Sequence, residues 1–92
     1  MARYRRNFIA GGTFFFTVKL ADPKSRLLVE HIDLLRAAYM DVQKQYPFET
    51  VAVCVLPNHI HAIWTLPPDD ADYSLRWRLI KTKFSAHFPR AE

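Results

Sequence analysis

The chain has 92 residues, of which 50% are hydrophobic and 14% are aromatic. This composition predicts one small folded domain and excludes a disordered chain. The single cysteine excludes a disulfide framework and a four-cysteine zinc site, and it suits a reducing, cytoplasmic setting. No apolar run approaches the ~18 residues of a membrane span, and the basic start lacks the long apolar region of a signal peptide. We therefore expect no membrane association.

The formal net charge is +4, and the basic residues are concentrated at the two ends of the chain. Residues 1–26 carry six basic residues against one acidic residue, residues 76–92 carry five against one, and residues 27–75 carry two against seven. Two separate basic segments suit a polyanionic partner, nucleic acid in the first place. Charge alone leaves ordinary solvated surface as an equal alternative.

The first predicted element is a strand. A basic arm, residues 1–12, ends in a pair of glycines, and Thr13–Ala21 is rich in aromatic and β-branched residues. Asp22-Pro23 closes this strand. Its side chains alternate between two faces, with Phe14, Phe16, Val18 and Leu20 on one and Thr13, Phe15, Thr17 and Lys19 on the other.

Two helices and a hairpin are predicted beyond it. Apolar residues spaced three and four apart indicate a helix from Ser25 to about Tyr46, ended by Pro47. Two strands follow, 49–56 and 59–66, joined by the two-residue turn Pro57-Asn58. After a polar loop, a second helix is predicted over 74–87, with Asp72 or Ser74 as its N-cap.

The resulting order, β-α-β-β-α, predicts an α+β, ferredoxin-like fold with an open antiparallel sheet and two helices on one face. The final strand of a full βαββαβ domain is missing, so we expect a chain that is cut short. An unpaired sheet edge can recruit another chain, which predicts a homodimer through the open sheet edge.

The stretch LPNHIHAIWTLP places two histidines one residue apart in an apolar run. On a strand, His59 and His61 share one face, while Ile60, Ala62 and Trp64 occupy the other and pack on the helices. The histidines then lie on the open face. Two neutral imidazoles can hold one divalent cation with help from a third ligand, and a metal with open positions suits phosphodiester cleavage. The spacing alone leaves structural histidines as the alternative.

This stretch resembles the His-hydrophobic-His motif of the HUH nucleases. The whole chain resembles the N-terminal part of the REP-associated tyrosine transposases, relatives of the single-tyrosine insertion-sequence transposases. The similarity runs through YRRNFIAGGTFFFTV, Tyr4–Val18, and through the segment from Pro47 to Phe84. The resemblance implies cleavage and rejoining of single-stranded DNA beside palindromic hairpins through a 5′-phosphotyrosine link. It also implies Mg²⁺ or Mn²⁺ held by His59 and His61.

The family's nucleophilic tyrosine is absent from this chain. In the family it lies beyond the second helix, in a motif similar to His-Val-Asp-Tyr-Ile-x-x-Asn-Pro, whereas this chain ends at FPRAE. A further metal ligand is expected from the same later region. Tyr39 and Tyr46 fit the buried stripe of the first helix, Tyr73 is expected to be half exposed, and Tyr4 lies in the arm, so none of them matches. We expect residues 1–92 to form a truncated catalytic domain, inactive alone, and the resemblance implies a prokaryotic, nucleoid-associated location.

Two groups of residues are candidate DNA contacts. In the arm, Tyr4, Arg5 and Arg6 can stack on unpaired bases and grip phosphates, or form a frayed tail with nonspecific contacts. The second helix carries Arg76, Arg78, Lys81 and Lys83, which suit the DNA backbone or simple solvation. Phe15 can stack a base, contact a second copy or pack on another segment.

Two other functions remain open from the sequence. One is a noncatalytic hairpin-DNA binding remnant, which keeps recognition and has lost the chemistry. The other is a ferredoxin-like RNA-binding domain with structural histidines, which ranks last because the chain lacks the aromatic RNP pattern. The acidic residues between the last strand and the last helix indicate a polar loop and a helix cap rather than a metal site.

Overall fold

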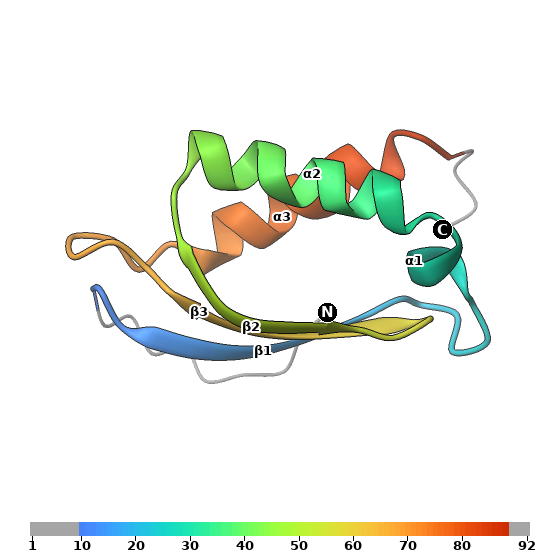
Figure 1. The fold of residues 1–92 in the computed structure, drawn as a ribbon, viewed down its shortest axis with the longest axis horizontal. Helices are drawn as coiled ribbons and strands as arrows, with labels where there is room; N and C mark the ends of the chain where they lie inside the picture. The colour runs from blue at the N-terminus through green and yellow to red at the C-terminus, as the bar shows by residue number, and fades with distance from the viewer. Residues whose placement is uncertain (1–9, 89–92) are drawn as a thin grey trace.

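The computed structural model describes residues 10–88 of the chain. Its elements are, in order, β1 (Thr13–Lys19), α1 (Leu27–Glu30), α2 (Ile32–Gln45), β2 (Glu49–Val55), β3 (His59–Thr65) and α3 (Tyr73–Ser85). The helices lie together over one face of the sheet (Figure 1). The predicted β-α-β-β-α order and the open antiparallel sheet are confirmed.

The first predicted helix is interrupted. His31 lies between α1 and α2 with backbone angles of φ −121° and ψ 41°, which are not helical. Neither a proline nor a glycine stands at this position, so the sequence carries no local signal for the break. Beyond it, α2 buries Leu35 and Val42 of the predicted apolar stripe, and it also buries Ala38, which the stripe did not include.

The central strand of the sheet is β3, which pairs antiparallel with β1 on one side and with β2 on the other. His61 of β3 lies opposite Thr17 of β1 and opposite Cys54 of β2, and Lys19 of β1 lies opposite His59. The outer edges of β1 and β2 have no strand partner within residues 10–88. A homodimer through such an edge stays a prediction.

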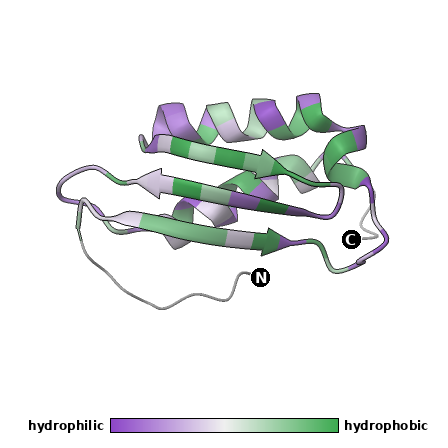
Figure 2. Cartoon of the chain, turned by 60° about the horizontal axis from the view of Figure 1, so that its bottom comes forward, coloured by the Kyte–Doolittle hydropathy of each residue, from purple (hydrophilic) through white to green (hydrophobic). Residues whose placement is uncertain are grey.

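The sheet has one buried and one open face. The helix-covered face carries the buried Phe16, Val18, Ile60 and Ala62, whereas Phe15 on the other face is 74% exposed. Figure 2 shows hydrophilic colour at the start of β3, between mostly hydrophobic neighbours. The predicted assignment of alternate residues to the two faces is confirmed.

Trp64 organises the core between the sheet and the helices. Its fully buried ring stacks on Phe48 at 4.0 Å and on Trp77 at 4.5 Å between ring centroids, and it meets the edge of Phe16 at 4.9 Å. Its indole N–H donates to the Tyr39 hydroxyl at 2.9 Å. Aromatic pairs of this kind contribute about 0.5–1.5 kcal/mol each beyond their buried area. These contacts hold β3 in its register against β1, β2 and α3.

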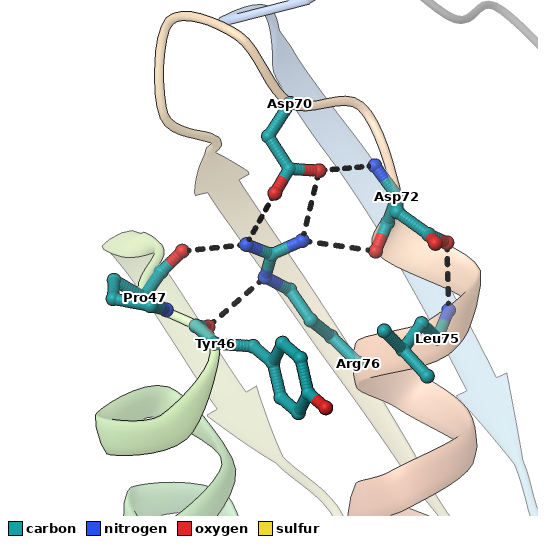
Figure 3. A network of polar contacts seen from close by, with 6 residues as sticks. All are labelled: Tyr46, Pro47, Asp70, Asp72, Leu75 and Arg76. Carbon is teal, nitrogen blue, oxygen red and sulfur yellow. Dashed lines mark hydrogen bonds and ion pairs between the residues drawn. The ribbon is translucent and has the colours of Figure 1, made fainter.

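Arg76 joins three segments of the chain (Figure 3). Its side chain is 2% exposed and forms a two-pronged ion pair with Asp70, at 3.2 Å from Nη1 to Oδ1 and 3.0 Å from Nη2 to Oδ2. The guanidinium also donates to the carbonyl oxygens of Tyr46, Pro47 and Asp72, at 3.0, 2.8 and 3.0 Å. The network thereby ties the α2–β2 connection and the β3–α3 loop to α3.

The expectation that Arg76 contacts DNA is therefore wrong. Its guanidinium is buried and its donors are used within the fold, so it has no free surface to offer a phosphate. In the same loop, the Asp72 side chain accepts from the Leu75 backbone N–H at 3.1 Å and caps α3, as predicted.

Asp70 also fixes the point at which the chain enters β1. Its backbone carbonyl accepts from the Gly11 N–H at 2.9 Å. Gly11 has a φ of 72°, and a side chain there would bring its Cβ to 3.1 Å from Pro68 Cα. Glycine is therefore required on two grounds, backbone conformation and space.

Within residues 10–88, no helix has the length and apolar character needed to cross a membrane.

We predict that Asp70→Asn lowers the free energy of unfolding by about 1–3 kcal/mol, because it leaves the buried Arg76 charge without its carboxylate. This loss is smaller than the usual cost of breaking a fully buried ion pair because the Asp70 side chain is 35% exposed. The matched control is Asp69→Asn, which removes the neighbouring, exposed charge. Urea unfolding at neutral pH measures both variants, and equal stability of the two would contradict the role of Asp70.

The same comparison has a pH signature. The hydrogen bonds from Arg76 hold the pKa of Asp70 below its ordinary value. The contribution of Asp70 to the free energy of unfolding is therefore complete above the pKa of about 3.9 that the group has in the unfolded chain. This contribution is lost as the pH falls through the lower pKa of the folded state. The stability difference between the original chain and Asp70→Asn shrinks accordingly below about pH 4.

Candidate metal centre and nucleic-acid interface

His59 and His61 lie side by side on the open face of β3, as predicted. Their ring centroids are 4.8 Å apart and their planes are perpendicular. Between and beside them, Ile60 and Ala62 point the other way and are buried under the helices. The core is therefore built without either histidine, which weakens the alternative that they serve packing.

Each imidazole uses its Nδ1 atom within the protein. His59 Nδ1 is 2.8 Å from Asn58 Oδ1, and His61 Nδ1 is 3.2 Å from Thr17 Oγ1. Within residues 10–88, the Nε2 atom of neither ring has a hydrogen-bond partner. Neutral imidazole ligates a metal through a nitrogen lone pair, so the two Nε2 atoms are the available donors.

The pair is an incomplete metal site as far as the described residues go. No group of three or more His, Cys, Asp or Glu side chains within residues 10–88 is arranged to hold a metal ion. Cys54 is exposed and pairs with His61 across the sheet, yet it does not complete such a group. Two imidazoles fit a divalent cation that takes its remaining ligands from water, substrate or another segment.

The cations predicted on the second helix do not form one surface. Arg76 is buried, Arg78 is exposed, and the Lys83 ammonium lies 3.4 Å from Asp41 Oδ2 on α2. These residues belong to the helical layer, whereas the histidines lie on the opposite face of the sheet. A single flat DNA surface containing all of them is excluded by this arrangement.

Lys81 has a different position from the other three. It lines a cavity of about 180 Å³ between α3 and the end of β1, together with Lys19 and Leu20. Burial lowers the pKa of its ammonium group. Lys19 of β1 pairs with His59 of β3 across the sheet. The cavity therefore lies at the same end of the sheet as the two histidines.

The open face has further groups suited to a nucleic acid. Phe15 is exposed and lies two residues before Thr17, on the same face of β1. Lys19 is also exposed and on this face. The arm residues Tyr4, Arg5 and Arg6 lie outside the described residues, so their predicted DNA contacts stay predictions.

The described tyrosines all belong to the helical layer. Tyr39 is half-buried and hydrogen-bonded to Thr50 and Trp64, and burial raises the pKa of its hydroxyl. Tyr73 is fully buried and Tyr46 is 37% exposed, so the expectation of a half-exposed Tyr73 and a buried Tyr46 is wrong. None of these three hydroxyls is placed on the histidine face.

The sequence reasoning missed the polar partners of the histidines. The sequence predicts only a turn at Asn58. Its position directly before His59 is the one signal that its side chain could contact the imidazole ring. Thr17 was assigned to the open face of its strand, but its pairing with His61 depends on the register of β1 against β3. That register joins residues far apart in the sequence and has no local signal.

No family model matches the chain. Among curated proteins, it is 43% identical over 90 residues to a putative REP-associated tyrosine transposase of Haemophilus influenzae, covering 98% of this chain and 51% of that protein. It is 51% identical over 85 residues to the REP-associated tyrosine transposase of Escherichia coli K12, covering 92% of this chain and 52% of that protein.

A solved structure is similar as well. It is described as that of a REP-associated tyrosine transposase bound to a REP hairpin. The TM-score is 0.88 and the identity is 49%, over 95% of this chain and 53% of that one. By sequence and by fold, the chain is therefore similar over nearly its whole length to the REP-associated tyrosine transposases, and it spans about half the length of the relatives that it matches.

Proposed function

We propose that this chain supplies the metal-binding and hairpin-DNA-binding surface of a single-tyrosine DNA transposase of the HUH type. The observation that carries the proposal is the pair His59 and His61. They lie side by side on a sheet face that no helix or strand of residues 10–88 covers (Figure 1), and both Nε2 atoms are unpaired among these residues. The similarity to a transposase that was solved with a REP hairpin supports the choice of DNA as the partner.

In this proposal, His59 and His61 hold one divalent cation, Mg²⁺ or Mn²⁺, through their Nε2 atoms. When bound, such an ion polarises a phosphate and offsets the negative charge that develops on its oxygens. The perpendicular rings, each tied through Nδ1, keep the two donors in place. The exposed face around them leaves room for a single DNA strand.

The neighbouring side chains orient the strand. Lys19, opposite His59, places a positive charge beside the site and attracts the phosphate backbone. Phe15 offers an exposed ring on which an unpaired base can stack. In the arm, Tyr4, Arg5 and Arg6 add an aromatic group and two guanidiniums that suit the foot of a hairpin.

The attacking tyrosine is proposed to come from a segment outside residues 1–92. Tyr39, Tyr46 and Tyr73 belong to the helical layer, and two of them are held by the core. The complete protein would cleave and rejoin DNA through a 5′-phosphotyrosine link, whereas residues 1–92 alone would bind without cleaving.

We predict that His59→Ala/His61→Ala weakens Mn²⁺ binding by at least about tenfold, since even changes in groups that only support metal ligands cost roughly 10–100-fold. His87→Ala is the matched control, because His87 is an exposed histidine at the end of α3. Titration of Mn²⁺ followed by electron paramagnetic resonance measures the free ion. Unchanged affinity in the double variant would overturn the metal assignment.

We predict that the chain prefers a single-stranded hairpin to a duplex of the same sequence, and that Arg5→Ala/Arg6→Ala weakens hairpin binding. Each lost phosphate contact should reduce the slope of log K against log salt concentration by roughly 0.7–0.9. Fluorescence anisotropy at several salt concentrations measures both quantities.

The matched control for that experiment is Arg36→Ala, which removes an exposed arginine from α2. Its affinity and salt slope should stay close to those of the original chain. Equal affinity for hairpin and duplex, together with no effect of the arm variant, would contradict hairpin recognition. Equal affinity for RNA and DNA hairpins would instead favour the RNA-binding alternative.

A further inference from the structure

The turn between β2 and β3 is held by backbone hydrogen bonds from two other segments and by one within the hairpin. The Leu28 N–H donates to the Pro57 carbonyl at 3.2 Å, and the Leu20 N–H donates to the Asn58 carbonyl at 2.9 Å. Within the hairpin, the Leu56 N–H donates to the His59 carbonyl at 2.8 Å. The backbone of the Pro57-Asn58 turn is therefore fixed by Leu20, directly after β1, by Leu28 of α1 and by the hairpin itself.

The side chain of Asn58 bridges two further groups. Its amide nitrogen donates to the Pro23 carbonyl at 2.8 Å, and its amide oxygen lies 2.8 Å from His59 Nδ1. A carbonyl oxygen can only accept, so the NH₂ end of the amide must face Pro23. The oxygen end must then face the histidine.

This orientation dictates where His59 carries its proton. The amide oxygen is an acceptor only, so a hydrogen bond to it requires a proton on Nδ1. In a neutral imidazole one nitrogen is protonated and the other has a lone pair. A proton on Nδ1 leaves the lone pair on Nε2, the atom without a partner among residues 10–88.

His61 provides an internal contrast. Its Nδ1 contacts the Thr17 hydroxyl at 3.2 Å. A hydroxyl can donate or accept, so Thr17 is compatible with either tautomer of His61. The two histidines of the pair therefore differ, because only His59 has its tautomer dictated by a fixed neighbour.

We propose that Asn58 is a positioning residue that holds His59 as the Nδ1–H tautomer and so presents Nε2 as a metal donor before any metal arrives. This inference rests on the proposed function of the histidine pair. Partners of this kind fix the ring orientation and tautomer of metal-binding histidines, and their loss typically costs 10–100-fold in metal affinity.

The direct test is the tautomer of His59 in the metal-free chain. Long-range ¹H–¹⁵N correlation spectra distinguish Nδ1–H from Nε2–H imidazole at a pH where the rings are neutral. We expect His59 to be in the Nδ1–H form in the original chain and to lose this preference in Asn58→Ala. An Nε2–H tautomer in the original chain would overturn the proposal without any variant.

A second variant separates the two contacts of Asn58. Asn58→Asp keeps an acceptor toward His59 but removes the donor to Pro23. If Asn58 acts through the tautomer, Asn58→Asp retains Nδ1–H and Mn²⁺ affinity near that of the original chain, whereas Asn58→Ala loses about 10–100-fold in affinity. Equal loss in both variants would mean that Asn58 only anchors the turn, and the proposal would fail.

The outcomes distinguish this inference from the proposed function. Mn²⁺ binding that is unaffected by Asn58→Ala would refute the role of Asn58 and leave the histidine site standing. An Nδ1–H tautomer in a chain that binds no Mn²⁺ would refute the metal site and the purpose assigned to the tautomer. Thr17→Val is the control, because it alters the partner of His61 and should leave the His59 tautomer unchanged.

Discussion

The alternation of β3 across the centre of the sheet is the constraint on which the rest of the structure depends. Because the strand lies between β1 and β2, its inward residues must fill the core while its outward residues face the open side. Trp64 satisfies the first demand with stacking contacts on both sides of its ring. A slip of one residue would bury His59 and His61 and expose Trp64, so the same packing that stabilises the fold also places the histidines.

Ion pairs and hydrogen bonds then fix the loops at both ends of this strand. At its start, the turn that carries Asn58 is held by Leu20, by Leu28 of α1 and by Pro23. At its end, Arg76 and Asp70 hold the β3–α3 loop against the α2–β2 connection. A buried arginine with few partners would destabilise the fold, whereas this one is neutralised by a carboxylate and surrounded by carbonyl oxygens. The buried charge of Arg76 therefore has a structural role, whereas the charge of Lys19 on the open face is exposed.

The face assignment of the histidines could be predicted because a period of two needs only the local sequence. The role of Arg76 could not, because helical spacing does not distinguish an exposed arginine from one whose partners come from two distant loops. Tyr73 was misplaced for a related reason, since the aromatic cluster that buries it includes Phe14 and Phe16 of β1. The break at His31 has no sequence signal, and the contact of Thr17 with His61 depends on the long-range register of the sheet. Local patterns thus predicted which residues face which way, and tertiary contacts decided which polar groups remain available.

We propose that the open face of the sheet, and not the helical layer, is the functional surface. Paramagnetic broadening of amide signals by a small amount of Mn²⁺, in the ¹⁵N-labelled chain mixed with an unlabelled DNA hairpin, tests it most directly. We expect that signals from the start of β3 and from its neighbours Lys19 and Cys54 disappear first, while signals from α2 and α3 persist. Broadening centred on α3 or on the acidic loop of Asp69, Asp70 and Asp72 would contradict it.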